Sequence, residues 1–501
     1  MDNIKILGIT FSYNLSFREH FRLAGGKALK RLNYLKALGG TFWGASKTHI
    51  ARLANTCVLS ILDFGTHITS FAGKTDFGRI EKILNQVTRF TTGLPRWTPI
   101  PVLRAEAGVG SARERSDRIS LSFLFKQLAL SGQTPTKEAI KGVESQVSTA
   151  VFNRLPYGLL LSKFTGKHAI CTDNIIPFTH PSQVTHSHNL VIFANELPFQ
   201  CHGNSCPPAE IQKKFQDYRR SNWESRIIIA TDCSKSVDGV AVAIVNATTK
   251  STQTGKIHNL NSAFTGEVCA IIIAIQKEIT DASKEYVICT DSLSTLQALH
   301  NVSRKSPTPI LQLSNVIAKK LLHCVSLTLV WVPAHVGIDI NEQADTAAKN
   351  ALCSTITTQW VNHKDLQNQT KRDEKATIQT AWTCSKYALG FSHLSANKPT
   401  QPISLTRAED SLLSRLRTRS LPTKYVLCKV NLDQSPTCQT CNTPDTNDHV
   451  LLTCTKYDQP RNELRRALGT IPMSYNWICL MSTSNRKIAK SVAKFLLATN
   501  I

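Results

Sequence analysis

Between residues 226 and 352 the sequence alternates short β-branched runs with longer stretches of helical periodicity, and this alternation constrains the fold more than any other feature. Three runs come first, separated by few residues: SRIIIATDCSKS, GVAVAIVNAT and KSTQTGKIHNL. They are best explained as three strands in hairpin order. TGEVCAIIIAIQKEI then predicts a buried helix, YVICTD and VSLTLVWV predict two more strands with helices between them, and NEQADTAAKNAL predicts a last helix. We therefore expect an α/β domain, with a mixed five-stranded sheet and helices on its faces.

Four acidic residues occupy positions where this secondary structure brings them together. Asp232 follows the apolar run IIIA, Glu267 lies in the first turn of the long helix, Asp291 comes directly after YVICT, and Asp345 lies in the last helix. Active sites in α/β sheets gather at the ends of adjacent strands. We expect the four carboxylates to share one edge of the sheet.

A group of carboxylates suits hard divalent cations. Mg²⁺ prefers oxygen ligands and keeps several of its waters, so a site for phosphodiester hydrolysis needs several convergent carboxylates and few other ligands. Two ions about 4 Å apart activate the attacking water and stabilise the leaving oxygen. Without a cation, four like charges would repel one another and raise their pKa values.

Four segments carry a family resemblance. In chain order, TDCSKS, TGEVCAI, CTDSLS and WVPAHVGIDINEQADTAAK resemble the four motifs of type 1 ribonucleases H, and the likeness covers residues 226–353. The resemblance implies a ribonuclease H-like fold and an endonuclease that uses two Mg²⁺ ions, with Mn²⁺ as an alternative. Such an enzyme hydrolyses the RNA strand of an RNA–DNA hybrid and leaves 5′-phosphate and 3′-hydroxyl ends.

The same resemblance implies roles for individual residues. Asp232 would bridge both ions, Glu267 and Asp291 would complete one side, and Asp345 would hold the second ion. His335, in the loop before the last helix, matches a mobile histidine that assists proton transfer or product release.

One position departs from the family pattern. The family usually has glycine after the first aspartate, whereas this chain has Cys233. A side chain there restricts the backbone angles. We expect this to affect the efficiency of catalysis more than the identification of the family.

A second cluster of metal-binding residue types lies near the C-terminus. Cys438, Cys441, His449 and Cys454 form the pattern C-x2-C-x7-H-x4-C. Tetrahedral Zn²⁺ takes thiolate and imidazole ligands at such short spacings. We predict a small zinc-binding module, because the metal adds about 10–16 kcal/mol of apparent binding energy in comparable peptides.

The flanks of the predicted domain are strongly basic. The chain has 501 residues and a net charge of +24, of which residues 1–225 contribute +13, residues 226–352 contribute +1 and residues 353–501 contribute +10. Such a charge indicates an anionic polymer as partner, because neutralised phosphates release counterions. An RNA–DNA hybrid, or nucleic acid more generally, is therefore the expected partner.

Sequence periodicity divides the remainder of the chain. We expect a mostly helical region at 1–160, an irregular connector at 161–225, a helical region at 354–430, and the zinc motif with C-terminal helices at 431–501.

The opening KILGITFSYNLSFREHF and the helices after it resemble the segment that follows the polymerase palm, comparable to a thumb, in jockey-like non-LTR retrotransposon reverse transcriptases. Those elements continue into a ribonuclease H domain and a cysteine–histidine motif. The resemblance therefore implies the C-terminal part of a retrotransposon polyprotein, and it leaves a polymerase partner open.

Polymerase activity is not expected in this chain. It requires a paired-aspartate turn, and no two aspartates are adjacent anywhere in the sequence. Two alternatives to an active nuclease remain: a catalytically silent nucleic-acid-binding remnant, and an unproductive fragment whose first 160 residues need a missing palm to fold.

The sequence has neither a membrane-spanning apolar run nor the plan of a signal peptide. We expect an intracellular protein, in the nucleus or the cytoplasm, that is not secreted and does not enter a membrane. Its cysteines are then expected to be reduced.

Overall fold

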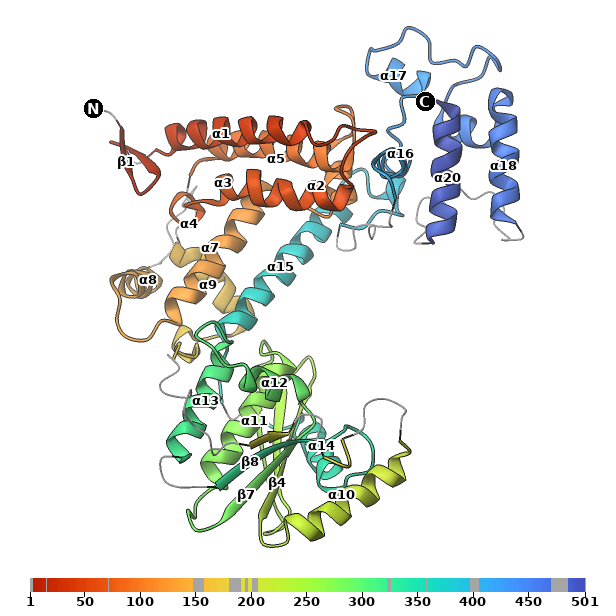
Figure 1. The fold of residues 1–501 in the computed structure, drawn as a ribbon. Coiled ribbons are helices and arrows are strands. Elements are labelled where there is room, and N and C mark those ends of the chain that lie inside the picture. Colours follow the sequence, from red (N-terminus) through yellow and green to blue (C-terminus); the bar gives the residue numbers. More distant parts are fainter. Residues whose placement is uncertain are drawn as a thin grey trace. The chain divides into compact units, whose positions relative to one another are not determined.

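The chain divides into two compact units. The computed structural model describes residues 3–14, 16–70, 72–146, 157–179, 191–193, 197–200, 206–321, 326–356, 358–396, 405–469 and 485–500. Unit 1 comprises Met1–Ser120, Thr149–Tyr157 and Lys371–Ile501, and unit 2 comprises Leu121–Ser148 and Gly158–Thr370 (Figure 1). Within the described ranges, no helix combines the length and the apolar character that a bilayer span requires.

Unit 2 is built around a mixed sheet. Its strands are β3 (Val191–Phe193), β4 (Ile227–Lys235), β5 (Val240–Asn246), β6 (Ser251–Ile257), β7 (Glu285–Thr290) and β8 (Ser326–Trp331). Their order across the sheet is β3-β8-β7-β4-β5-β6. Strands β3, β8, β7 and β4 run parallel, whereas β5 and β6 continue the sheet antiparallel through two hairpins.

Unit 2 also contains a set of helices, most of which pack on this sheet. They are α8 (Pro135–Gln146), α9 (Tyr157–His168), α10 (Pro208–Asn222), α11 (Ala263–Lys277), α12 (Leu293–His300), α13 (Thr308–Leu321) and α14 (Asp339–Ala351). Helices α11, α12 and α13 pack on one face, and α10 and α14 pack on the other (Figure 1). All seven residues of β5 are buried, as expected for a strand covered on both sides.

The predicted sheet with flanking helices is confirmed, and the structure adds two features to it. The short strand β3, within the range 161–225 that the sequence left irregular, extends the sheet by pairing with β8. Helix α10 lies in the same range. Its side chains Ile211 and Phe215, together with Trp223, are buried against β4, β7 and β8.

The sheet also has partners beyond residue 353. The backbone of Thr358 pairs with Lys256 at the end of β6, and the amide of Asn261 donates a hydrogen bond to the carbonyl of Trp360 at 2.8 Å. Leu366 is completely buried. The packed unit is therefore wider than the motif-bearing segment at 226–353.

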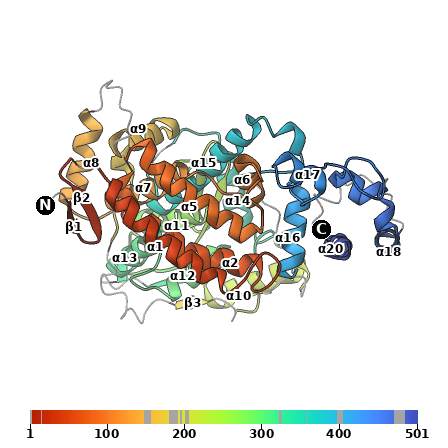
Figure 2. The ribbon, with the colours of Figure 1, turned by 90° about the horizontal axis from the view of Figure 1, so that it is seen from above.

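The N-terminal part of unit 1 is helical, as the sequence predicts. A hairpin of β1 (Asn3–Ile6) and β2 (Ile9–Ser12) precedes its helices. These are α1 (Arg18–Lys36), α2 (Lys47–Ala54), α3 (Ser60–Asp63), α4 (Thr66–Thr69), α5 (Lys74–Thr92), α6 (Ile100–Ala107) and α7 (Ala112–Leu128), the last of which runs into unit 2. Figures 1 and 2 both show α1 lying alongside α5, and the apolar faces of the two helices form the core of this region.

Unit 1 is completed by the other end of the chain. Helix α15 (His363–Thr383) enters it from unit 2 and is followed by α16 (Arg407–Arg417), α17 (Lys424–Lys429), α18 (Asp458–Leu468) and α20 (Arg486–Thr499). Helix α16 begins with a capping box formed by Thr406 and Glu409. Apolar residues of α16, α18 and α20 share one core with Cys438 and Cys454.

A buried ion pair joins the two halves of unit 1. Arg417 of α16 donates hydrogen bonds to both carboxylate oxygens of Glu106 in α6, one of them at 2.5 Å. The Ser414 hydroxyl donates to Glu106 at 2.9 Å, and the Lys47 ammonium lies 3.5 Å from it. Because Glu106 is fully buried, these partners compensate a charge that would otherwise be very costly.

Candidate functional site

Strand register places Asp232 beside Asp291. The parallel pairing of β4 with β7 ends at Thr231 and Thr290, so each aspartate is the next residue after a paired threonine. Strand β4 itself continues past Asp232 to Lys235, because its antiparallel pairing with β5 persists. Asp232 therefore lies inside the sheet, 4% exposed, where its neighbouring strand stops.

Helix α11 brings Glu267 to the same place. A Cβ at Gly266 would lie 2.5 Å from the Cys233 sulfur and 2.6 Å from a Val240 methyl, so only glycine lets the helix approach the β4–β5 hairpin this closely. The helix begins at the N-cap Ser262, whose hydroxyl accepts a hydrogen bond from the Thr265 backbone N–H.

Asp365 fixes the start of α11 from outside the motif segment. Its Oδ2 accepts hydrogen bonds from the Ser262 backbone N–H at 3.0 Å and from the Thr265 hydroxyl at 2.6 Å. A carboxylate is favourable at a helix N-terminus. Sequence reasoning missed this residue, because nothing in the local pattern around Asp365 links it to a helix 100 residues earlier.

Three of the predicted carboxylates converge. Oxygen atoms of Asp232, Glu267 and Asp291 all lie within 4.8 Å of one another. Burial, followed by the charge of Asp291, raises the pKa of Asp232 from 3.8 to about 7. Burial, followed by the charges of Asp232 and Asp291, raises the pKa of Glu267 from 4.5 to about 9.

Raised pKa values of neighbouring buried carboxyl groups are a property expected of residues that bind a cation. Oε2 of Glu267 is buried and has no hydrogen-bond partner. Buried carboxyl groups without partners are costly, and a divalent ion bound by oxygen atoms would remove that cost. The donor set and the orphaned oxygen therefore fit a hard divalent metal.

Asp345 of α14, the helix on the sheet face opposite to α11, also lies near the three clustered carboxylates. It lies close enough to Asp232 to contribute, after burial and Asp291, to the raised pKa of that group. Asp345 is bonded to the ammonium of Lys349, one helical turn later, at 2.6 Å. The structure thus brings all four predicted carboxylates into one neighbourhood, with Asp345 the most strongly paired to a cation.

His335 lies on an exposed loop next to Asp345. Its Nδ1 is 4.0 Å from the Asp345 carboxylate, and its side chain is 70% exposed. The residue has φ +55°, a left-handed conformation that is uncommon for a residue with a side chain. An exposed, locally strained histidine is suited to moving into and out of a site.

Two residues near this edge escaped the reasoning from sequence. Glu342 lies one helical turn before Asp345. Together with His335 and Asp345 it forms a second group of potential ligand atoms, all within 4.8 Å of one another. Asn341 is 2% exposed, and its side chain bonds to Asp291. Three- and four-residue spacing on the predicted helix was a signal for Glu342, since such residues share a helix face.

Cys233 occupies the position where the family pattern has glycine. Its backbone N–H donates to Oδ1 of Asp232 at 2.7 Å, and its thiol contacts the carbonyl of Ala263 at 3.3 Å. Burial, followed by the nearby charge of Glu267, raises the thiol pKa, so the sulfur is a neutral neighbour of the cluster.

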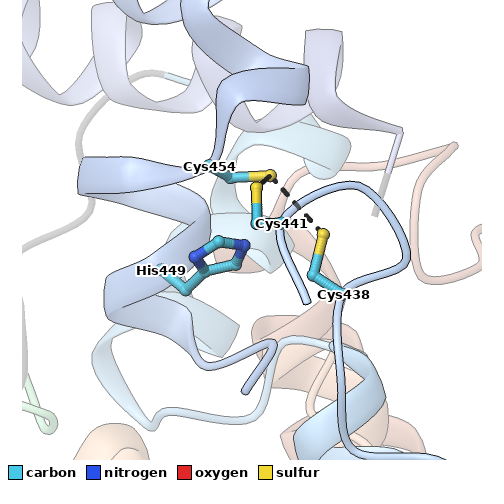
Figure 3. Close-up of side chains that lie close together, drawn as sticks. All are labelled: Cys438, Cys441, His449 and Cys454. Carbon is cyan, nitrogen blue, oxygen red and sulfur yellow. Dashed lines mark hydrogen bonds between the residues drawn. The ribbon is translucent and has the colours of Figure 1, made fainter. Parts of the chain in front are cut away.

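The second predicted cluster is also assembled. Figure 3 shows Cys438, Cys441, His449 and Cys454 facing a common point, and their ligand atoms all lie within 4.8 Å of one another. The Cys454 sulfur is 3.8 Å from that of Cys438 and 3.9 Å from that of Cys441. A tetrahedral site with Zn–S bonds of about 2.3 Å requires sulfur atoms about 3.8 Å apart.

The imidazole of His449 is oriented for ligation through Nε2. Its Nδ1 lies within hydrogen-bond distance of the Thr443 and Thr453 hydroxyls, at 3.3 and 3.2 Å, whereas its buried Nε2 has no partner. Occupying one ring nitrogen leaves the other for the metal. The cluster fits a zinc ion.

Arg461 holds the segment between His449 and Cys454 in place. Its buried guanidinium donates to the carbonyls of Leu451 at 2.9 Å and Cys454 at 2.7 Å, and to Val450 at 3.1 Å. Sequence reasoning missed Arg461, since it reads as one more basic residue of a helix.

Comparison with known families agrees with the first of these sites. Residues 224–353 match the family model described as RNase H. The matched segment contains the four carboxylates and His335, and it supports a ribonuclease H domain, whose general activity is nucleic-acid binding and hydrolysis of RNA–DNA hybrids.

Proposed function

We propose that unit 2 is an active, metal-dependent endonuclease that hydrolyses the RNA strand of RNA–DNA hybrids. The observation that carries this proposal is the meeting of Asp232, Glu267 and Asp291 from three separate elements, with two of the pKa values raised to about 7 and about 9. Buried carboxylates with a purely structural role would be expected to pair with Lys or Arg side chains of the protein. This cluster leaves a buried carboxylate oxygen unpartnered.

Each residue then has a role that follows from its position. Asp232, which lies near Glu267 and Asp291 and also near Asp345, would hold two ions, with Glu267 and Asp291 on one side and Asp345 on the other. Two Mg²⁺ or Mn²⁺ ions supply an activated water and charge stabilisation at the phosphate. Asn341 orients Asp291, and Lys349 orients Asp345.

His335 is assigned to proton transfer or product release. Its exposure and its 4.0 Å distance from Asp345 allow the ring to approach the leaving group without being a fixed ligand. A group that acts in this way has its effect on turnover more than on substrate binding.

Recognition of the hybrid is expected to rest on its A-form-like geometry and on the 2′-hydroxyl, which distinguishes RNA from DNA.

We further propose that the chain is part of a retrotransposon polyprotein. The support is the order of its parts: a helical region, a segment that matches RNase H, and a cysteine–histidine cluster with zinc geometry. A catalytically silent remnant of such a polyprotein, which still binds nucleic acid, is the alternative to an active endonuclease, and only an activity measurement separates the two.

The test is cleavage of a labelled RNA–DNA hybrid with Mg²⁺, with duplex DNA as the control substrate. Asp232→Asn is expected to abolish cleavage while hybrid binding stays measurable, because it removes a metal ligand without adding bulk. Asp238→Asn, an exposed carboxylate in the β4–β5 turn, is the matched control and should cleave at the wild-type rate. Ca²⁺ should bind without supporting turnover, since its coordination is larger and looser.

Wild-type cleavage by Asp232→Asn would refute the assignment of this site. Hybrid binding without any cleavage by the wild-type protein would favour the silent remnant.

A further inference from the structure

A broad basic groove lies in unit 1, apart from both sites described above. It encloses about 860 Å³ between the end of α1, the second half of α5, the loop that follows α5, and α16. This volume is within the range of roughly 300–1,000 Å³ that is typical of ligand sites. Six cationic side chains line it: Lys36, Lys82, Arg89, Arg96, Arg407 and Arg415. Among the described residues, no aspartate or glutamate lines this groove.

Three of the cations are held in place by backbone carbonyls. Arg407 donates to the carbonyls of Gly40, Phe90 and Thr91, and Arg415 donates to Gly93 at 3.0 Å. Arg89 reaches the carbonyls of the loop that follows α5. Because carbonyls are neutral acceptors, these bonds orient the guanidinium groups without cancelling their charge.

The cations also crowd one another. Burial and the nearby charge of Arg96 lower the pKa of Arg89, and burial and the charge of Arg407 lower the pKa of Arg415. Like charges gathered in this way are unfavourable, and an anion placed between them would be stabilising.

Two exposed aromatic rings lie beside residues that line the groove: Phe42 next to Arg415, and Trp43 next to Gly40. Phe42 is 46% exposed and Trp43 is 59% exposed, both in the loop between α1 and α2. The guanidinium of Arg415 lies 4.8 Å from the centre of the Phe42 ring. Neighbouring exposed apolar side chains that are surrounded by polar residues often mark an interaction site.

The loop that presents these rings is a defined structure. The backbone N–H of Gly40 donates to the carbonyl of Trp43 at 2.9 Å, and the N–H of Ala45 donates to Leu38 at 3.2 Å. Gly44 has φ +96°, and a Cβ there would collide with backbone atoms of Leu38 and Gly39. The aromatic rings are therefore exposed on a turn whose backbone is hydrogen-bonded on itself.

An unpartnered polar group lies in the groove wall. Asn85 of α5 is 6% exposed and lines the groove, and its Oδ1 has no hydrogen-bond partner. Buried amide groups are normally paired, so this side chain is available to a ligand that enters the groove.

We propose that this groove binds single-stranded nucleic acid, with phosphates on the basic wall and bases stacked on Phe42 and Trp43. Positive grooves combined with aromatic platforms bind single strands with little sequence preference. The combination of anchored arginines and two exposed rings favours a single strand over a duplex, because the bases of a duplex are already stacked on one another. The inference does not depend on the nuclease, since it concerns other residues.

The test measures binding of a labelled oligothymidylate to the full chain by fluorescence anisotropy over a range of salt concentrations. Trp43→Leu should weaken binding by about 5- to 160-fold, the effect of losing one stacked base. Trp43→Phe retains a ring and should restore most of the affinity. The double variant Lys82→Gln/Arg96→Gln should flatten the dependence of log affinity on log salt by about 0.7 for each phosphate that the protein no longer neutralises.

The matched control is Lys487→Gln/Lys490→Gln, which removes the same charge from exposed positions on α20 and should leave the salt slope unchanged. Unchanged affinity in Trp43→Leu, or equal effects of the two double variants, would overturn the proposal. So would weakening of duplex binding alone, which would show that the groove holds a double helix.

Discussion

Replacing Glu267 with glutamine tests the electrostatics of the carboxylate cluster directly. In the metal-free protein the pKa of Glu267 is raised from 4.5 to about 9, first by burial and then by its acidic neighbours. At about pH 7.5 the folded protein therefore holds a proton on this group that the unfolded chain releases. At roughly 1.36 kcal/mol per pKa unit, this proton uptake destabilises the metal-free fold by up to about 4 kcal/mol.

Glutamine has nearly the same shape and carries no charge. After allowing about 1–3 kcal/mol for a buried amide that lacks partners, Glu267→Gln should raise the metal-free stability of unit 2 by about 1–3 kcal/mol. For a unit of this size that corresponds to roughly 2–10 °C in melting temperature.

The pH dependence has a definite sign. Because the folded pKa is raised, the wild type is most stable below about pH 4.5 with respect to this group and loses stability as the pH rises toward 9. The advantage of Glu267→Gln should therefore grow with pH across this window. At its acidic end it should reverse to a deficit of about 1–3 kcal/mol, because only the cost of the unpartnered amide remains there.

The assay is calorimetry of the full chain with zinc bound. The melting transition of unit 2 is identified as the one whose temperature changes when Mg²⁺ is added. Added Mg²⁺ should raise this transition in the wild type and much less in the variant. Asp345→Asn is the control: Asp345 is paired with Lys349, so its replacement should give no comparable gain. Equal or lower metal-free stability of Glu267→Gln at about pH 7.5 would refute the reasoning.

Three further outcomes are expected. The full chain should bind about one zinc ion, and Cys441→Ser should lose it, with faster hydrogen exchange near residues 438–454 and unchanged hybrid cleavage; absence of zinc in protein purified without chelator would contradict this. A fragment of residues 206–370 should melt at a markedly higher temperature than one of residues 226–353, because the shorter piece loses three buried side chains of the α10 segment, worth about 5–9 kcal/mol; equal melting temperatures would contradict it. Arg417→Met should destabilise unit 1 by about 3–5 kcal/mol by leaving a buried carboxylate without its partner, whereas an unchanged melting profile would show that this carboxylate is compensated elsewhere.

Much of unit 2 could be predicted from local sequence. Hydrophobic runs of strand length and the hairpin spacing predicted β4, β5 and β6, and an aspartate directly after an apolar run marked the site at Asp232 and Asp291. These signals work because strand ends and helix starts are encoded within a few residues. The predicted zinc spacing likewise needs only a short segment, and the structure brings its residues together.

Features that depend on distant residues could not be predicted. Asp365 acts on a helix 100 residues earlier, and α10 is recognised as part of the sheet domain only through packing of Phe215 and Trp223. The basic groove combines α1, α5 and α16, which no single window of sequence connects. Each of these features depends on tertiary contacts, and the local periodicity of the sequence carries no information about such contacts.

The ion pair between Glu106 and Arg417 also bears on the order in which the chain can fold during synthesis. The two residues are 311 positions apart, and all of the sheet domain lies between them. At about 5–20 residues per second, the ribosome takes roughly 15–60 s to supply the arginine after the glutamate has been made. Throughout that interval the acid of the N-terminal helices lacks its arginine partner and has only Lys47 nearby, while the sheet domain can already fold. Unit 2 is synthesised after the start of unit 1 but is complete before it, so it can fold first. The newly made N-terminal helices are therefore the part most in need of protection by a chaperone.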